Sequence, residues 1–172
     1  MTNISQKKEY MKRLLLDTNI YGELIFDGDF TKLKAAIPKK YVIHGFKVVR
    51  DELRDLPKEI KVEGKNLRIG LLHIYDELTK KSYGVTEEMA ALADDYYVNY
   101  RQMGGSKSKD KIYNDFLIVA CASSQQIDVV VSEDTKTMLV ENALKAYNLV
   151  NNVEKMKTPN FIGYLEFKRW LI

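Results

Sequence analysis

Short apolar segments alternate with longer helical patterns along this 172-residue chain, and that alternation limits the folds it can adopt. Three segments have the length and composition of buried parallel strands: 13–17, 41–43 and 128–131. Apolar residues at helical spacing occupy 18–25, 30–37, 46–56, 67–78, 86–103, 112–123, about 135–147 and 161–170. Strands that alternate with helices predict a three-layer α/β/α sandwich around a mainly parallel sheet.

Several boundaries follow from single residues. Pro38 is expected to end the helix that starts at Phe30. Thr86 is expected to be the N-cap of the helix predicted over 86–103. The segment 104–110, G-G-S-K-S-K-D, predicts a flexible basic loop, and a short extended stretch is expected near 153–156. The length fits a single domain over 1–172.

The composition limits the kind of site the protein can carry and the compartment in which we expect it. Apolar residues make up 45% and charged residues 30%, as in folded proteins, and the net charge of +3 permits a polyanionic partner without identifying one. The single cysteine, Cys121, allows neither an internal disulfide nor a cysteine-based zinc site. No apolar stretch approaches the ~20 residues of a membrane span, and the apolar run after the basic start is too short for a signal peptide. We expect a cytoplasmic protein.

Four acidic residues lie at strand ends or on helices that otherwise have buried faces: Asp17, Glu52, Asp115 and Asp134. Taken alone, Asp17 or Asp134 would be assigned as a helix N-cap. Together, carboxylates in one pocket repel one another unless a cation neutralises them. Oxygen ligands favour Mg²⁺ or Mn²⁺, as one or two ions, and ions held there suit phosphodiester hydrolysis by an activated water.

Glu52 is preferred to its neighbour Asp51 as the acid that faces this pocket. Successive helical residues point about 100° apart, so only one of the two can do so, and Glu52 borders the apolar stripe of its helix. The alternative for Glu52 is an exposed ion pair with Lys47 or Arg50.

The motifs around these acids resemble those of the PIN-domain ribonuclease family, in the family's order. They are L-L-L-D-T-N-I-Y (14–21), V-V-R-D-E-L (48–53), N-D-F-L-I-V-A-C-A (114–122) and D-V-V-V-S-E-D (128–134). The resemblance implies that the four acids are catalytic and bind the metal. It also implies supporting roles for Thr18, Asn19 and Ser132.

The chain departs from the family pattern in two places. The segment 65–108 is a long helical insertion, and Met138 stands where an aromatic residue is common. Small single-domain members resemble ribonuclease toxins of the VapC type. The implied partners are therefore single-stranded RNA, a second copy in a homodimer, and an antitoxin whose tail blocks the site.

Other side chains suggest contacts with RNA. A basic group just before Asp115 is a candidate for the phosphate backbone, with a solvated surface loop as the alternative: Arg101, Lys107, Lys109 and Lys111. Tyr96, Tyr97 and Tyr100 have the chemistry to stack bases, although Tyr96 and Tyr100 share a helical face that favours packing.

The chain lacks residues that two other classes of protein with an acid at a strand end require. A phosphotransferase of the haloacid-dehalogenase type needs a second Asp two residues after the first, where this chain has Asn19. A receiver domain needs an N-terminal acidic pair that is not evident. The alternative from another class is a catalytically silent PIN scaffold that binds RNA or protein.

Overall fold

A computed structural model describes residues 10–172. Its centre is a sheet of five parallel strands in the order β5-β2-β1-β6-β7. The strands are β1 (Lys12–Leu16), β2 (Tyr41–Phe46), β5 (Thr79–Tyr83), β6 (Val129–Val131) and β7 (Asn160–Ile162). A separate hairpin joins β3 (Lys61–Val62) to β4 (Lys65–Asn66).

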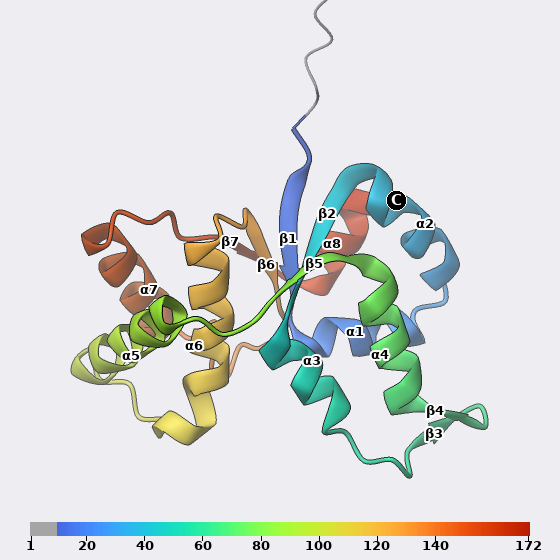
Figure 1. The fold of residues 1–172 in the computed structure, drawn as a ribbon, viewed down its shortest axis with the longest axis horizontal. Helices are drawn as coiled ribbons and strands as arrows, with labels where there is room; N and C mark the ends of the chain where they lie inside the picture. The colour runs from blue at the N-terminus through green and yellow to red at the C-terminus, as the bar shows by residue number, and fades with distance from the viewer. Residues whose placement is uncertain (1–9) are drawn as a thin grey trace, which may run out of the picture.

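Helices cover both faces of the sheet (Figure 1). One layer holds α5 (Glu87–Gln102), α6 (Lys109–Ser124) and α7 (Glu141–Val153). The other holds α1 (Thr18–Phe26), α2 (Phe30–Lys40), α4 (Leu67–Leu78) and α8 (Tyr164–Leu171). The short helix α3 (Lys47–Arg54) lies below the sheet in this view and packs on α1, α4 and α6. The predicted three-layer sandwich is confirmed.

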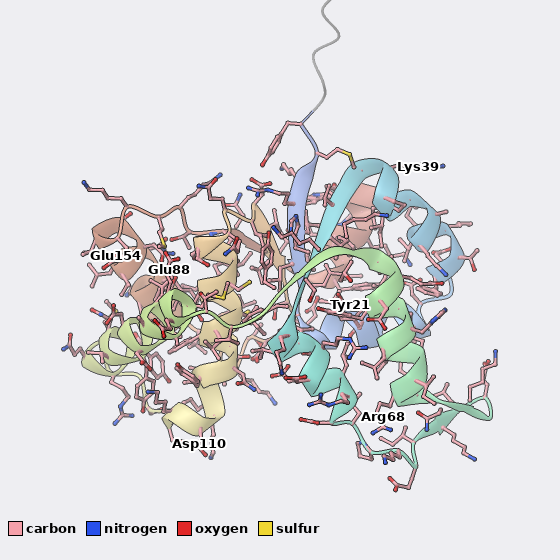
Figure 2. All side chains as sticks on the ribbon, viewed as in Figure 1. Tyr21, Lys39, Arg68, Glu88, Asp110 and Glu154 are labelled. Atoms are coloured by element: carbon pink, nitrogen blue, oxygen red, sulfur yellow. The ribbon has the colours of Figure 1, made fainter. Side chains whose placement is uncertain are left out.

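The central strands form because their residues are apolar on both faces. Leu14 and Leu15 in β1 and Val130 in β6 are fully buried, as expected for parallel strands covered by helices on both sides. On the α1 side, the rings of Tyr21 and Tyr75 pack 5.5 Å apart between α1 and α4, and Figure 2 marks Tyr21 there. A Cβ on Gly45 would lie 2.3 Å from the Tyr75 hydroxyl, so this strand position has no room for a side chain.

Several predicted boundaries were wrong. Helix α2 continues through Pro38 to Lys40, because a proline in the last turn removes only one hydrogen bond and the lysines there favour the helix C-terminus. The segment predicted to be helical from Phe161 begins with β7, and α8 starts only at Tyr164. After Asp134 the chain makes turns before α7 begins at Glu141.

Two other local predictions were also wrong. The stretch near 153–156 is not extended, because Val153 ends α7 and Lys155 has a φ of 56°. The loop predicted over 104–110 ends at Ser108, because α6 starts at Lys109. The Lys107 N–H donates to the Tyr100 hydroxyl at 3.0 Å, and Gly105 is buried against the same ring.

The segment 65–108 supplies more than helices. It contains α4 and α5 as expected, with Thr86 as the N-cap of α5, and it also contributes the edge strand β5 of the main sheet. Its description as a helical insertion within a single domain remains a prediction.

A charged cluster ties the connection between α1 and α2 to α8. The Asp27 carboxylate accepts hydrogen bonds from Lys168 Nζ at 2.8 and 2.9 Å and from the Tyr164 hydroxyl at 2.7 Å. The Asp27 side chain is only 9% exposed. The hydrogen bonds from Lys168 outweigh burial and lower the pKa of Asp27 to about 2.

Replacing Asp27 with asparagine is expected to lower the melting temperature by about 3–6 °C at pH 7, because charge-assisted hydrogen bonds are lost. A depressed folded pKa stabilises the fold above the ordinary value of 3.8, and that contribution disappears as pH falls through about 2. Thermal melts at pH 7 and pH 2.5 measure both effects. Asp29→Asn is the control with a smaller expected loss, because Asp29 also contacts Lys168 but its side chain is 38% exposed. An unchanged melting temperature for Asp27→Asn would contradict this assignment.

Candidate active site

The four predicted acids come from four parts of the chain and meet at the carboxyl end of the central strands. Asp17 directly follows β1 and caps α1, where its carboxylate accepts the Thr18 N–H at 2.7 Å. Asp134 follows β6, the neighbouring parallel strand. Glu52 lies on α3 and Asp115 on α6, two helices that pack against each other. Figure 2 marks the start of α6 with Asp110, less than two turns before Asp115.

The register of the sheet explains how Asp17 meets the loop after β6. Leu16 of β1 pairs with Val131 of β6, so the residues that follow each strand lie at the same level. The Ser132 hydroxyl donates to Asp17 Oδ2 at 2.6 Å and accepts the Asp134 N–H at 3.0 Å. Ser132 therefore connects two of the predicted acids directly.

Asn19 is a weaker second contact of Asp17. Its Nδ2 lies 3.4 Å from Asp17 Oδ2, and its Oδ1 accepts the Glu133 N–H at 3.3 Å. The structure therefore brings the predicted supporting residues Asn19 and Ser132 to the first acid.

Glu52 faces this site as predicted, and its neighbour Asp51 does not. The Thr18 hydroxyl donates to Glu52 Oε2, and Asn114 Nδ2 donates to Glu52 Oε1 at 3.2 Å. Asp51 instead pairs with Lys47 and Arg54 on its own helix. The alternative, an exposed ion pair between Glu52 and Lys47 or Arg50, was wrong, because Glu52 pairs with Thr18 and Asn114 instead.

Asp115 and Asp134 share one partner, the hydroxyl of Thr137. Thr137 Oγ1 contacts Asp115 Oδ2 and lies 2.6 Å from Asp134 Oδ2. Asp134 Oδ1 also accepts the N–H groups of Lys136 at 3.0 Å and Thr137 at 2.9 Å. Sequence reasoning missed Asn114 and Thr137. The motif N-D-F includes Asn114, whereas Thr137 has no signal in the sequence beyond its place three residues after an acid.

The electrostatics of this group disfavour charged carboxylates. Burial raises the pKa of Asp17 to about 6 against the hydrogen bonds it accepts, and Glu52 and Asp134 raise it further. Burial likewise raises the pKa of Asp115 to about 7, with added repulsion from Asp134, Asp17 and Glu52. The ionised acids therefore repel one another across the site, and a positive charge among them would relieve this repulsion.

Asp17, Asp115 and Asp134 are linked through the side chains of Ser132 and Thr137, and the four acids do not form a closed cage. Within residues 10–172, no three carboxylate, histidine or cysteine side chains are grouped so that they could hold one ion as they stand. Over the same residues, no helix is long and apolar enough to cross a membrane.

The predicted cations differ in their surroundings. Lys109 pairs with Asp94 at 2.7 Å and lies 4.9 Å above the Tyr113 ring, while Arg101 donates to the Gly105 carbonyl at 3.0 Å. Lys107 and Lys111 are exposed.

The tyrosines of α5 serve mainly as core residues. Tyr96 and Tyr100 are buried and pack edge-on against Phe116. Only Tyr97 of the three is partly exposed, so base stacking by Tyr96 or Tyr100 is excluded in this arrangement.

Neither a protein-family model nor a curated protein matches the sequence. Solved structures do resemble the fold. A chain of VapBC2 from Rickettsia felis, bound to a DNA fragment from its promoter, matches with a TM-score of 0.58 and 14% identity, over 88% of this chain and 98% of that one. A chain of DNA-bound VapBC from Salmonella typhimurium matches with a TM-score of 0.56 and 12% identity, over 90% and 99%. A chain of FitAB bound to an IR36 DNA fragment matches with a TM-score of 0.53 and 16% identity, over 88% of this chain and 94% of that one. At these identities the likeness is one of fold, and the chain has a VapC-like PIN fold.

Proposed function

We propose that this protein is a metal-dependent endoribonuclease that hydrolyses phosphodiester bonds of single-stranded RNA. The observation that carries the proposal is the convergence of Asp17, Glu52, Asp115 and Asp134 at one end of the sheet. Such a cluster lowers the stability of a fold unless a ligand neutralises it, so its presence favours a role in binding. All four acids are retained, which argues against a catalytically silent scaffold.

The donor set fits Mg²⁺ or Mn²⁺. Carboxylates and hydroxyls are the hard oxygen ligands that these ions prefer, and Mg²⁺ commonly takes only one or two carboxylates and keeps several waters. A site without three grouped carboxylates therefore still suits it. Asp17, Glu52, Asp115 and Asp134 would hold one or two ions. When bound, a divalent cation supplies Lewis-acid polarisation of a phosphate and acidification of an attacking water.

The chain's own residues hold the acids ready for this chemistry. Ser132 keeps Asp17 oriented, and Thr18 and Asn114 fix the two oxygens of Glu52. The thiol of Cys121 is not available as a nucleophile, since Cys121 is fully buried and burial raises its pKa to about 12. In the proposed reaction the nucleophile is a water molecule, which a bound divalent cation would activate.

Cleavage of end-labelled RNA tests the substrate class and the nucleophile together. With Mg²⁺, a single-stranded RNA should be cut and the same sequence in a duplex should not. The products should carry no 2′,3′-cyclic phosphate, because water attacks in place of the ribose 2′-hydroxyl. Cyclic-phosphate ends, or equal cleavage of the duplex, would contradict the proposal.

Lys111 is the predicted cation best placed to contact the RNA backbone. It is exposed and lies one helical turn before Asp115, whereas Lys109 is engaged by Asp94. Lys111→Gln is expected to weaken binding of single-stranded RNA and to lower the slope of log affinity against log salt by about 0.7. Lys109→Gln is the matched control and should change both values less. Fluorescence anisotropy in an Asp115→Asn background, in which cleavage is slow, measures the difference, and equal effects would argue against Lys111.

We also propose that the protein is the toxin of a type II toxin-antitoxin pair and forms a homodimer. The support is the fold, which it shares with chains of VapBC complexes, and an acidic site that suits an Arg or Lys from an extended partner peptide. Induction in bacterial cells should arrest growth and create new RNA 5′ ends, and Asp115→Asn should do neither. Sedimentation that shows only monomer across the micromolar range would overturn the dimer.

A further inference from the structure

Thr137 occupies a central position among the acids. Its hydroxyl lies between the carboxylates of Asp115, on α6, and Asp134, in the loop after β6. These two acids belong to segments separated by the whole of β6, and Thr137 is the side chain that contacts both. The contact therefore links the helix layer to the end of the sheet.

The backbone fixes the position of this hydroxyl. The N–H groups of Lys136 and Thr137 both donate to Asp134 Oδ1, and the Leu139 N–H donates to the Asp134 carbonyl at 3.0 Å. The next residue, Met138, is fully buried and its carbonyl accepts the Tyr147 hydroxyl at 2.8 Å. A turn held at both ends leaves Thr137 little freedom to move away from the two acids.

The number of donors in this contact is too small for two carboxylates. A threonine hydroxyl has one hydrogen, so it can donate to Asp115 or to Asp134 but not to both at once. Ser132 has no such deficit, because it donates to Asp17 and accepts from a backbone N–H. When both acids are ionised, either Asp115 Oδ2 or Asp134 Oδ2 lies beside the Thr137 oxygen without a hydrogen bond from it. A cation that faces the two carboxylates would offset the repulsion between these oxygens.

We propose that Thr137 is a positioning residue that sets the spacing of Asp115 and Asp134 for a divalent cation. This inference rests on the proposed function and adds a residue to it. Residues that orient metal ligands through hydrogen bonds typically change metal affinity by about 10–100-fold when removed. Thr137→Val keeps the branched shape of the side chain and replaces the hydroxyl with a methyl group, so it removes the hydrogen bond to Asp115 or Asp134.

Binding of Mn²⁺ to the full chain, followed by electron paramagnetic resonance, tests the inference without RNA. Thr137→Val is expected to raise the dissociation constant for Mn²⁺ by about 10–100-fold. Thr137→Ser restores the hydroxyl and should return the constant close to that of the wild type. Thr135→Val is the matched control, because Thr135 is an exposed threonine of the same loop whose side chain makes no hydrogen bond to the four acids. Its affinity should not change.

Each outcome decides the inference. If the wild type binds Mn²⁺ and Thr137→Val binds it equally well, the positioning role is overturned while the proposed function stands. If Thr137→Ser is as weak as Thr137→Val with both variants folded by circular dichroism, the hydroxyl is not the determinant and the inference fails. If the wild type itself does not bind Mn²⁺, both the inference and the proposed function are overturned.

Discussion

Replacing Asp115 with asparagine is expected to lower the turnover of single-stranded RNA by at least about 100-fold while the fold stays intact. Loss of a residue that merely orients a ligand lowers metal affinity or activity by about 10–100-fold, so loss of a ligand should reach or exceed that range. Asparagine has almost the same volume as aspartate and its carbonyl can still accept a hydrogen bond from Thr137, so packing is retained. Turnover at saturating Mg²⁺ and a thermal melt of the same sample measure the two effects.

Asp110→Asn is the control for this substitution. Asp110 lies on the same helix as Asp115 but is exposed, in the first turn (Figure 2). Its replacement removes the same charge from the protein as a whole and should leave turnover near the wild-type value. Comparable turnover of Asp115→Asn and wild type would show that Asp115 has only a structural role.

The second large effect concerns stability without metal. The folded pKa values of Asp17 and Asp115 are raised from 3.8 to about 6 and about 7, mainly by burial. A carboxyl whose folded pKa is raised binds protons more readily in the folded state, so the free energy of unfolding should fall as pH climbs from about 4 through about 7. A shift of two units corresponds to roughly 3 kcal/mol for one isolated group.

Asp17→Asn removes one of these charges and should raise the melting temperature of metal-free protein at pH 8 by about 5 °C. Asparagine remains a good N-cap for α1, so the substitution should not weaken the helix. At pH 5 the difference should shrink, because Asp17 is largely protonated in the folded wild type. Added Mg²⁺ should stabilise the wild type and have much less effect on the variant.

Thermal melts at both pH values, with and without Mg²⁺, separate the two roles of Asp17. A variant that melts below the wild type at pH 8 without metal, together with a wild type that gains nothing from Mg²⁺, would identify Asp17 as a structural cap alone. The account of the acidic cluster would then be wrong.

The central strands and the positions of the acids could be predicted from the sequence because both depend on local pattern. A strand buried on two faces is a run of apolar residues, as in β1 and β6, and the residue after such a strand lies at the sheet end where sites form. The edge strand β5 was missed because its sequence, T-K-K-S-Y, is polar and mostly exposed. Its strand conformation depends on pairing with β2, which the local sequence does not encode.

The partners of the acids depend on contacts between distant segments. Thr137 reaches Asp115 across 22 residues, and Asn114 reaches Glu52 across 62. The need for Gly105 in the basic loop before α6 is also a tertiary effect, because a Cβ there would lie 2.3 Å from the Tyr100 ring. The motifs predicted the acids and the supporting residues Thr18, Asn19 and Ser132, whereas Asn114 and Thr137 were recognised only from the tertiary structure.

The most direct test of the central claim is the cleavage of single-stranded RNA by protein that has been stripped of metal with EDTA and then titrated with Mg²⁺ or Mn²⁺. The carboxylate site predicts no turnover in EDTA and full recovery when either ion is added in excess, with turnover by Asp115→Asn staying at least about 100-fold lower than that of the wild type. Undiminished cleavage in excess EDTA would contradict it.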